Sequence, residues 1–156
     1  MGKGPQRRNG EAPHRCGGRS EARRALRAWF RTPLGRRLAE ADREQLDAVL
    51  PNLFGFHLLQ AGDLVGVDLV TSSRVRHRVV MAEGDNEARC RAGLRAEAEA
   101  LPVASESVDV VLLPHVLEIH NRPHEVLREV ERCLIPEGHV VVLGLNPWSL
   151  WGAWRL

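Results

Sequence analysis

The 156-residue sequence contains no tyrosine, a single lysine and no long apolar run. Because no segment approaches the ~20 apolar residues that cross a bilayer, neither a transmembrane helix nor a membrane partner is expected. The first twenty residues lack the apolar stretch of a secretory signal. The three cysteines form no Cys-x-x-Cys pair and are typical of a chain whose thiols stay reduced. These absences indicate a cytoplasmic protein.

Aromatic residues make up only 4% of the chain, so the core must be built mainly from Leu, Val and Ala. Residues 1–19 are rich in Gly, Pro and Arg and are predicted to form a disordered basic tail. The remaining length is natural for one domain, which we place at residues 20–156.

The net charge of +2 is unevenly distributed along the chain. Residues 1–43 contain twelve Lys or Arg against four Asp or Glu, a net +8, whereas residues 44–156 have a net charge of −6. A basic arm on an acidic domain can bind nucleic-acid phosphates without sequence specificity. The alternative is that arginine serves here as the general solubilising residue. Nucleic acid is therefore a partner that the sequence leaves open.

Two helices are predicted before the first strand, within residues 20–50. Ser20 is the expected N-cap of the first, which runs to Trp29. Its outward-facing residues are expected to be Arg23, Arg24 and Arg27. Thr32 and Pro33 fit the cap and first position of the second helix, which continues to about Leu50.

Short apolar segments alternate with polar ones from residue 56 onward. The expected strands are 56–60, 77–82, 93–96, 108–113 and 140–143, and the expected helices are 64–73, 87–92, 123–134 and a last one after Pro147. Residues 108–113 form the clearest strand, because a continuous β-branched run is typical of a parallel strand covered on both faces. This alternation predicts an α/β fold with a mostly parallel sheet.

The helix at 123–134 has one apolar face, which is expected to pack on the sheet and consists of Val126, Leu127, Val130 and Leu134. Cys133 lies on the same side and is expected to be a buried thiol. Asp109, inside the clearest strand, is expected to make a structural hydrogen bond rather than to act in chemistry.

Three motifs in the second half of the chain belong together. They are the acidic-Ala-Glu-x-Leu-Pro turn at 97–102, Ser-Val-Asp-Val-Val at 107–111, and Leu-Arg-Glu-Val-x-Arg-x-Leu-x-Pro-x-Gly-His at 127–139. The chain therefore resembles the class I S-adenosylmethionine-dependent methyltransferases of the type 11 kind, closely over 94–143 and more weakly over 55–83. The resemblance implies a Rossmann-like, doubly wound sheet, N-terminal helices near the ligand cleft, and S-adenosylmethionine as cofactor.

The resemblance also implies cofactor-binding residues. Where the family has a Gly-x-Gly-x-Gly loop after the first strand, this sequence retains Gly62 and Gly66. Glu83, or alternatively Asp85, corresponds to the acid that holds the ribose hydroxyls after the second strand. Glu97 and Ala98 match the pair that contacts adenine, with the carboxylate accepting from the exocyclic amine and the backbone N–H donating to the ring.

Two further positions are candidates near the reacting groups. His115 follows the clearest strand and could line the donor site, contact the cofactor, act as a base, or only hydrogen-bond the backbone. Asn146 lies in a segment similar to the Asn-Pro-x-Ser-x-Trp motif of a bacterial subgroup, near the expected acceptor. No metal site is expected, because Pro123 interrupts the helix that the His120/His124 spacing would need.

Family members continue with another helix and an antiparallel strand pair, whereas this sequence stops at Leu156. The chain is therefore expected to be truncated, with 140–143 as an exposed apolar sheet edge open to self-association. Methyl transfer to an unidentified acceptor is the predicted function. The alternative is a non-catalytic Rossmann-like module that uses its basic arm to contact nucleic acid or protein.

Overall fold

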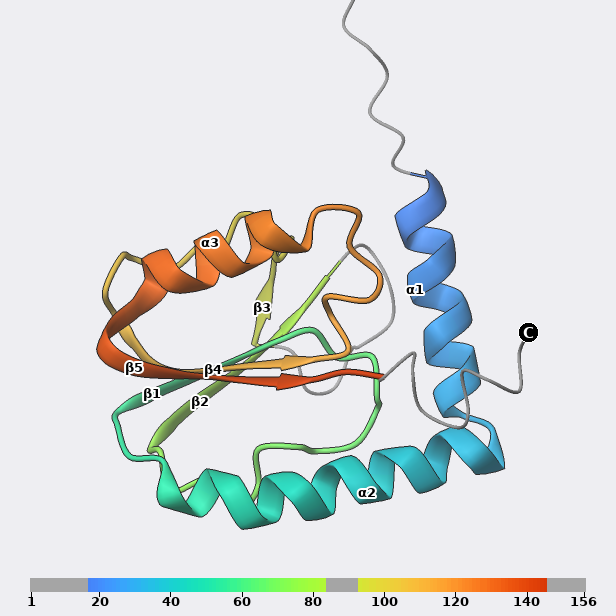
Figure 1. Ribbon diagram of the computed structural model, residues 1–156, viewed down its shortest axis with the longest axis horizontal. Coiled ribbons are helices and arrows are strands. Elements are labelled where there is room, and N and C mark those ends of the chain that lie inside the picture. The colour runs from blue at the N-terminus through green and yellow to red at the C-terminus, as the bar shows by residue number, and fades with distance from the viewer. Residues whose placement is uncertain (1–16, 84–92, 146–156) are drawn as a thin grey trace, which may run out of the picture.

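The computed structural model describes residues 17–83 and 93–145 (Figure 1). Its centre is a five-stranded sheet in the order β3-β2-β1-β4-β5, in which every pairing is parallel. The strands are β1 (His57–Ala61), β2 (His77–Ala82), β3 (Leu94–Arg95), β4 (Val108–Pro114) and β5 (Leu134–Leu143). Strand order reverses between β1 and β4, which makes their carboxyl ends the topological switch point. The predicted doubly wound α/β fold is confirmed.

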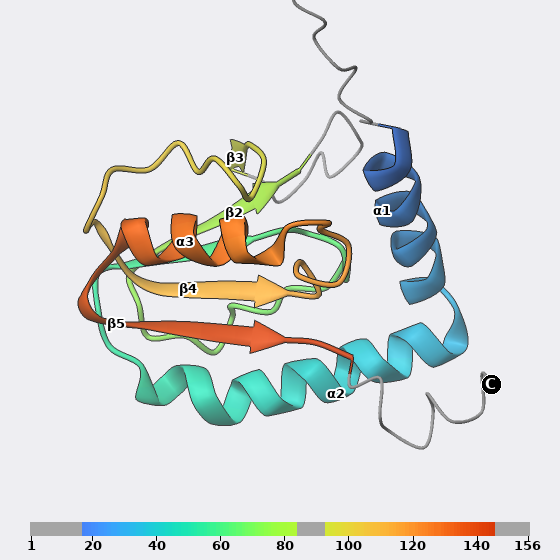
Figure 2. The same cartoon turned by 45° about the horizontal axis from the view of Figure 1, so that its top comes forward.

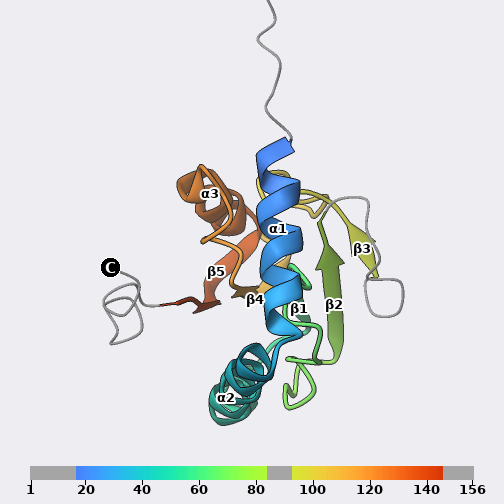
Figure 3. The same cartoon turned by 90° about the vertical axis from the view of Figure 1, so that its right-hand side faces the viewer.

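Helices cover both faces of this sheet and one of its ends. The helical elements are α1 (Gly17–Phe30), α2 (Pro33–Val49), the 3-10 turn η1 (Leu50–Asn52) and α3 (Pro123–Cys133). Figure 2 shows α3 on one face of the sheet and α2 on the other. Seen end-on, α1 stands in front of the sheet, beyond the carboxyl ends of the strands (Figure 3). The helices predicted at 20–29, 32–50 and 123–134 are present, and α1 lies near the ligand edge, as the family resemblance implied for the N-terminal helices.

Strand β4 joins the two halves of the core because its side chains alternate between them. Val111 and Leu113 pack into the cluster under α3, and Val110 and Leu112 pack into the cluster under α2. All four are fully buried, as a strand covered on both faces requires. Asp109 makes the predicted structural bonds, because its Oδ2 accepts the backbone N–H groups of residues 56 and 57 at 3.0 and 2.9 Å.

The helix predicted at 64–73 is wrong, since this segment is a series of bends and turns. Gly66 has a positive φ of 75°, and the Asp68 carboxylate accepts the Val70 N–H at 3.1 Å. The guanidinium of Arg78 donates to the carbonyls of Val70 and Thr71. These bonds replace those of a helix, and the segment still buries apolar side chains against α2.

The start of β5 also differs from expectation, because this strand begins at Leu134 rather than at residue 140. Val108 pairs with Leu134 but Val110 pairs with His139, so residues 135–138 leave the regular ladder as a bulge. The predicted turn at 136–138 is thus an interruption within a strand, with Glu137 at a φ of 65°.

Two smaller predictions need correction, and two lie outside the described residues. Helix α1 begins at Gly17, so Ser20 lies within it and is not its cap, whereas Thr32 caps α2 as predicted. On α3, Val126, Val130 and Cys133 are buried as expected, but Leu127 is exposed. The helices expected at 87–92 and after Pro147 fall in ranges that the structure does not describe.

Strand β5 forms one edge of the sheet within the described ranges, and its Val140 and Val142 side chains are 45% and 46% exposed. The apolar character predicted for this edge is confirmed. Self-association through it stays a prediction.

The corner between α1 and α2 depends on the absence of a side chain at Gly35. A Cβ there would overlap the backbone oxygen of Trp29 and lie 2.5 Å from the Cα of Phe30. Replacing Gly by Ala normally stabilises a helix by about 1 kcal/mol. In Gly35→Ala we expect overpacking, which costs roughly 1 to 3 kcal/mol, to outweigh that gain. Urea denaturation should therefore show a lower free energy of unfolding; an unchanged or higher value would contradict this packing.

Candidate functional site

The carboxyl ends of the parallel strands bring the predicted site residues to one edge of the sheet. Gly62 follows β1, Glu83 follows β2, and His115 follows β4. Glu97 and Ala98 come directly after β3. Asn146 lies outside the described residues. Ligands of open α/β sheets bind at this edge, so we place the candidate site here.

The turn after β1 contains the two predicted glycines, and their surroundings differ. Gly62 has a φ of 98°, and a Cβ on it would lie 2.8 Å from Val116, so close packing requires glycine there. Gly66 also has positive φ, but no atom lies within 4 Å of where its Cβ would be. The side-chain oxygen of Gln60, a buried residue, has no hydrogen-bond partner among the described residues. The turn therefore has open space at Gly66, and the end of β1 before it holds a buried side-chain oxygen without a partner in the described part of the chain.

Glu83 is the most constrained acid of the site, being only 5% exposed. Its Oε1 accepts the Ala98 N–H at 2.8 Å and lies 3.1 Å from Nε2 of His120. Its Oε2 accepts from Nη2 of Arg23 at 2.7 Å. Burial would raise the pKa of Glu83, but His120, Arg23 and the Ala98 N–H together lower it. The carboxylate is therefore ionised.

His120 connects this carboxylate to a second one. Its side chain is buried, and its Nδ1 lies 3.2 Å from Oε1 of Glu99. Burial would lower the pKa of His120, but hydrogen bonds and charge from Glu83 and Glu99 raise it. Sequence reasoning considered His120 only as a metal ligand. The available signal was its position in the loop after the clearest strand.

Of the two residues predicted to contact adenine, Glu97 has an accessible side chain, whereas the N–H of Ala98 is already hydrogen-bonded. The Glu97 side chain is 47% exposed, and its Oε2 lies 3.6 Å from Nη2 of Arg23. The Ala98 N–H, expected to face a ligand, instead donates to Glu83. Glu97 is thus available to a ligand, whereas the N–H of Ala98 is already in use.

His115 lies between two carboxylates and is 1% exposed. Its Nε2 is 3.0 Å from Oδ2 of Asp42 on α2, and its Nδ1 is 3.1 Å from Oε2 of Glu118. Burial would lower the pKa of His115, but these bonds raise it to about 9. The ring is therefore protonated at neutral pH. Glu118 also accepts the N–H of Leu145, so this cluster ties α2 to the ends of β4 and β5.

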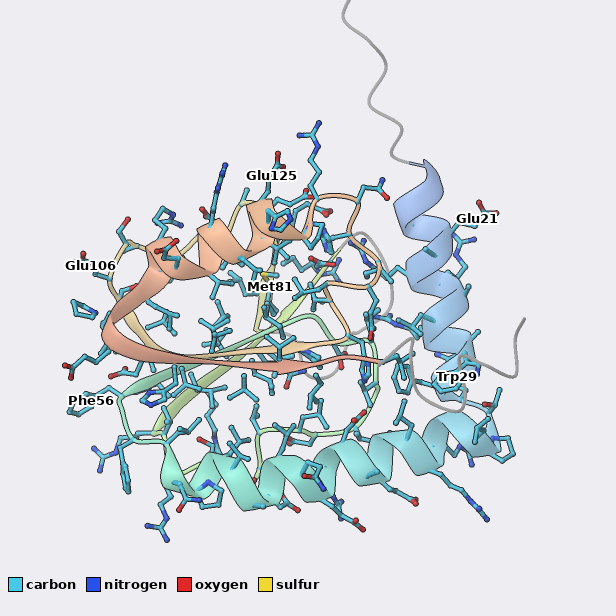
Figure 4. The ribbon with its side chains drawn as sticks, viewed as in Figure 1. Glu21, Trp29, Phe56, Met81, Glu106 and Glu125 are labelled. Carbon is cyan, nitrogen blue, oxygen red and sulfur yellow. The ribbon has the colours of Figure 1, made fainter. Side chains whose placement is uncertain are left out.

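Two of the three arginines expected on the outside of α1 point to the sheet instead. Arg23 contacts Glu83, and Nη2 of Arg27 donates to the carbonyl of Asp63 at 2.9 Å. Arg24 remains exposed, and Figure 4 shows Glu21 pointing away from the sheet on the same helix. The acidic and carbonyl groups at the strand ends attract the guanidinium groups, which the helical pattern alone could not reveal.

A groove lies at the opposite end of the strands from these residues. This open groove of about 670 Å³ runs between α3 and β5 and is lined in part by Glu106, Leu127 and Glu137. Its charged lining residues are exposed or half-buried, in contrast to Glu83, His115 and His120. The buried charges favour the carboxyl edge as the functional site.

Within residues 17–83 and 93–145, no group of three His, Cys, Asp or Glu side chains is placed to hold a metal ion. The helices in those same ranges are all too short or too polar to span a membrane.

A parallel sheet in this strand order, with helices on both faces, defines a Rossmann-like fold class. A family model described as a methyltransferase domain matches residues 52–142, more than half of the chain. The chain belongs to the class I S-adenosylmethionine-dependent methyltransferase family.

Three similar proteins illustrate this relationship. The uncharacterized protein YafS of Escherichia coli (strain K12) is 36% identical over 129 residues, 82% of this chain and 52% of that protein. An S-adenosylmethionine-dependent methyltransferase from Thermotoga maritima has a TM-score of 0.64 at 21% identity, covering 85% of this chain and 64% of its own. The methyltransferase CalH, solved with S-adenosylhomocysteine, has a TM-score of 0.57 at 16% identity, covering 91% and 48%. The chain thus spans about half the length of its curated relative.

The His115 cluster predicts a pH dependence of stability. Folding raises the pKa of His115 from 6.5 to about 9, so its stabilising contribution is complete below pH 6.5 and is lost as the pH rises through 9. Such a shift corresponds to about 3 kcal/mol. We expect urea denaturation at successive pH values to show a falling free energy of unfolding across this interval.

His115→Gln should reduce this slope, because its side chain does not titrate, while His120, whose pKa folding also raises, keeps its own contribution. His124→Gln, which changes an exposed histidine on α3, serves as the matched control and should keep the slope of the unmodified chain. An equal slope in His115→Gln and the unmodified chain would rule out the His115 cluster as its source.

Proposed function

We propose that this chain binds S-adenosylmethionine at the carboxyl edge of its sheet and transfers the methyl group to an acceptor. Membership of the methyltransferase family supports the reaction class. The observation that carries the proposal is the pair of acids after β2 and β3, Glu83 and Glu97, beside the turn at Gly66. A nucleoside carrying a cationic amino-acid group fits acids and open backbone at a topological switch point.

Each residue has a proposed binding role. The open space at Gly66 and the unused oxygen of Gln60 suit the amino-acid part of the cofactor, whose ammonium needs an acceptor. Glu83 would hold the ribose hydroxyls, and Glu97 would accept from the adenine amine. Gly62 supports the turn by allowing it to pack on Val116. Ala98 contributes by fixing Glu83 through its N–H.

The sulfonium methyl group of the cofactor is already activated, so the chain has to bind, align and exclude water. Helix α1 lies across the strand ends and borders the site (Figure 3). We assign His115 a positioning role, because a protonated ring between Asp42 and Glu118 has no lone pair with which to accept a proton. Asn146 remains a proposed acceptor-side residue.

The proposed methyl acceptor is a nucleophile that is small enough or flexible enough to reach the strand ends under α1. The non-catalytic alternative relied on a basic N-terminal arm. Arg23 and Arg27, which contribute to that arm, face the sheet and are less accessible to nucleic acid than the sequence suggested. This orientation favours the enzyme over the binding module.

Calorimetric titration of the 156-residue chain with S-adenosylhomocysteine tests the proposed site. We expect saturable binding, and we expect Glu97→Gln to weaken it about tenfold, because a hydrogen bond to a charged group contributes roughly 1.5 to 3 kcal/mol. Glu131→Gln, an exposed substitution on α3, is the matched control and should bind as the unmodified chain does.

Two results would count against the proposal. Absence of binding at millimolar ligand, on chain shown to be folded by circular dichroism, would reject the cofactor site and favour the non-catalytic module. Equal affinity of Glu97→Gln and the unmodified chain would reject the adenine role of Glu97 alone.

A further inference from the structure

One side chain of α1, that of Arg23, contacts both acids of the proposed cofactor site. Nη2 of Arg23 lies 2.7 Å from Oε2 of Glu83 and 3.6 Å from Oε2 of Glu97. The Arg23 side chain is only 12% exposed, so its guanidinium lies between α1 and the strand ends rather than in solvent. The protein itself therefore supplies a cation where the proposed function requires ribose and adenine.

The carboxylate of Glu83 cannot serve Arg23 and a ribose at the same time. An ionised carboxylate has about four acceptor positions. The Ala98 N–H uses one on Oε1, and the ring N–H of His120 lies 3.1 and 3.3 Å from the two oxygens. With Arg23 on Oε2, too little capacity remains for two ribose hydroxyls. One of the three donors has to leave.

Arg23 is the donor that can leave. Ala98 follows β3 and His120 lies in the loop after β4, so both belong to the sheet, whereas Arg23 belongs to α1. The Arg23 Nε is buried and has no hydrogen-bond partner within the described part of the chain. The contact between Arg23 and the acids therefore leaves one buried N–H of the guanidinium without a hydrogen bond to any described residue.

The N-terminal half of α1 is held to the sheet by charge rather than by apolar packing. Phe30, the last residue of the helix, is buried, while the side chains of residues 20–22, 24 and 25 are exposed. Arg23 donates to the carboxylate of Glu83, and Arg27, in the second half of the helix, donates to the carbonyl of Asp63. Figure 1 shows α1 meeting α2 at a corner, where Phe30 is anchored in the core, so Arg23 lies on the part of α1 farther from this anchor.

We propose that Arg23 is a latch that closes α1 over the cofactor acids and is released from Glu83 when the cofactor binds. The inference rests on the proposed function. In the closed state Arg23 neutralises Glu83 and touches Glu97; in the open state the ribose hydroxyls replace it. Because only the open state binds, the apparent affinity is reduced by the fraction of chains that are closed.

Arg23→Gln tests the latch, with Arg24→Gln as the matched control, since Arg24 is the neighbouring arginine on the exposed side of α1. Glu83 keeps His120 and the Ala98 N–H in both variants, so neither should unfold the site. We expect Arg23→Gln to bind S-adenosylhomocysteine roughly three- to tenfold more tightly than the unmodified chain. Its α1 amides should also exchange hydrogen faster without ligand. Arg24→Gln should change neither measurement.

Arg23→Lys provides a second variant that keeps the charge but not the guanidinium fork, and it should have an intermediate affinity. Weaker binding by Arg23→Gln than by the unmodified chain would overturn the latch and make Arg23 a cofactor ligand. Unchanged affinity together with unchanged exchange would also overturn it.

Failure of the proposed function gives a different result. In that case neither the unmodified chain nor any Arg23 variant binds S-adenosylhomocysteine, although all are folded. Binding by Arg23→Gln but not by the unmodified chain would support both the cofactor site and the latch.

Discussion

The ionised, buried carboxylate of Glu83 is the constraint on which the functional edge of this protein depends. A buried charge is tolerated only when donors surround it. Here they come from α1, from the turn after β3 and from the loop after β4, through Arg23, Ala98 and His120. Three segments far apart in the sequence are thus fixed relative to one another by a single side chain. Glu83 is also proposed to hold the ribose of the cofactor, so the donors within the protein and the ribose hydroxyls compete for the same carboxylate oxygens.

The elements that could be predicted are those with a local signal. Strand β4 has a continuous apolar run, and Thr32 with Pro33 marks the start of α2. Glu83 and Glu97 were singled out by the family resemblance, and the parallel topology adds that residues after parallel strands meet at one edge. The predictions of β4 and of the start of α2 needed only periodicity and cap chemistry.

Other features could not be predicted because they arise from pairs distant in the sequence. Arg23 and Glu83 are separated by 60 positions in the sequence. The helical pattern places Arg23 on the outer face of α1, but it cannot show that a carboxylate of the sheet lies next to that face. His120 gains its role only through Glu83 and Glu99. The irregular segment 64–73 reads as a helix by composition, but Arg78 and Asp68 hold its turns through side-chain bonds.

Helix α2 has a consequence for how the chain acquires its structure. It covers the face of β1 and β4 formed by Leu58, Val110 and Leu112, yet it precedes the region matched by the family model. The residues recognised as the methyltransferase domain would alone cover this face only in part, through side chains such as Val65, Leu69 and Val75. During synthesis α2 emerges well before β4, so its apolar stripe lacks Val110 and Leu112 until the central strand is made. The contact between α2 and β4 is therefore one of high sequence separation, the kind of contact that correlates with slow folding.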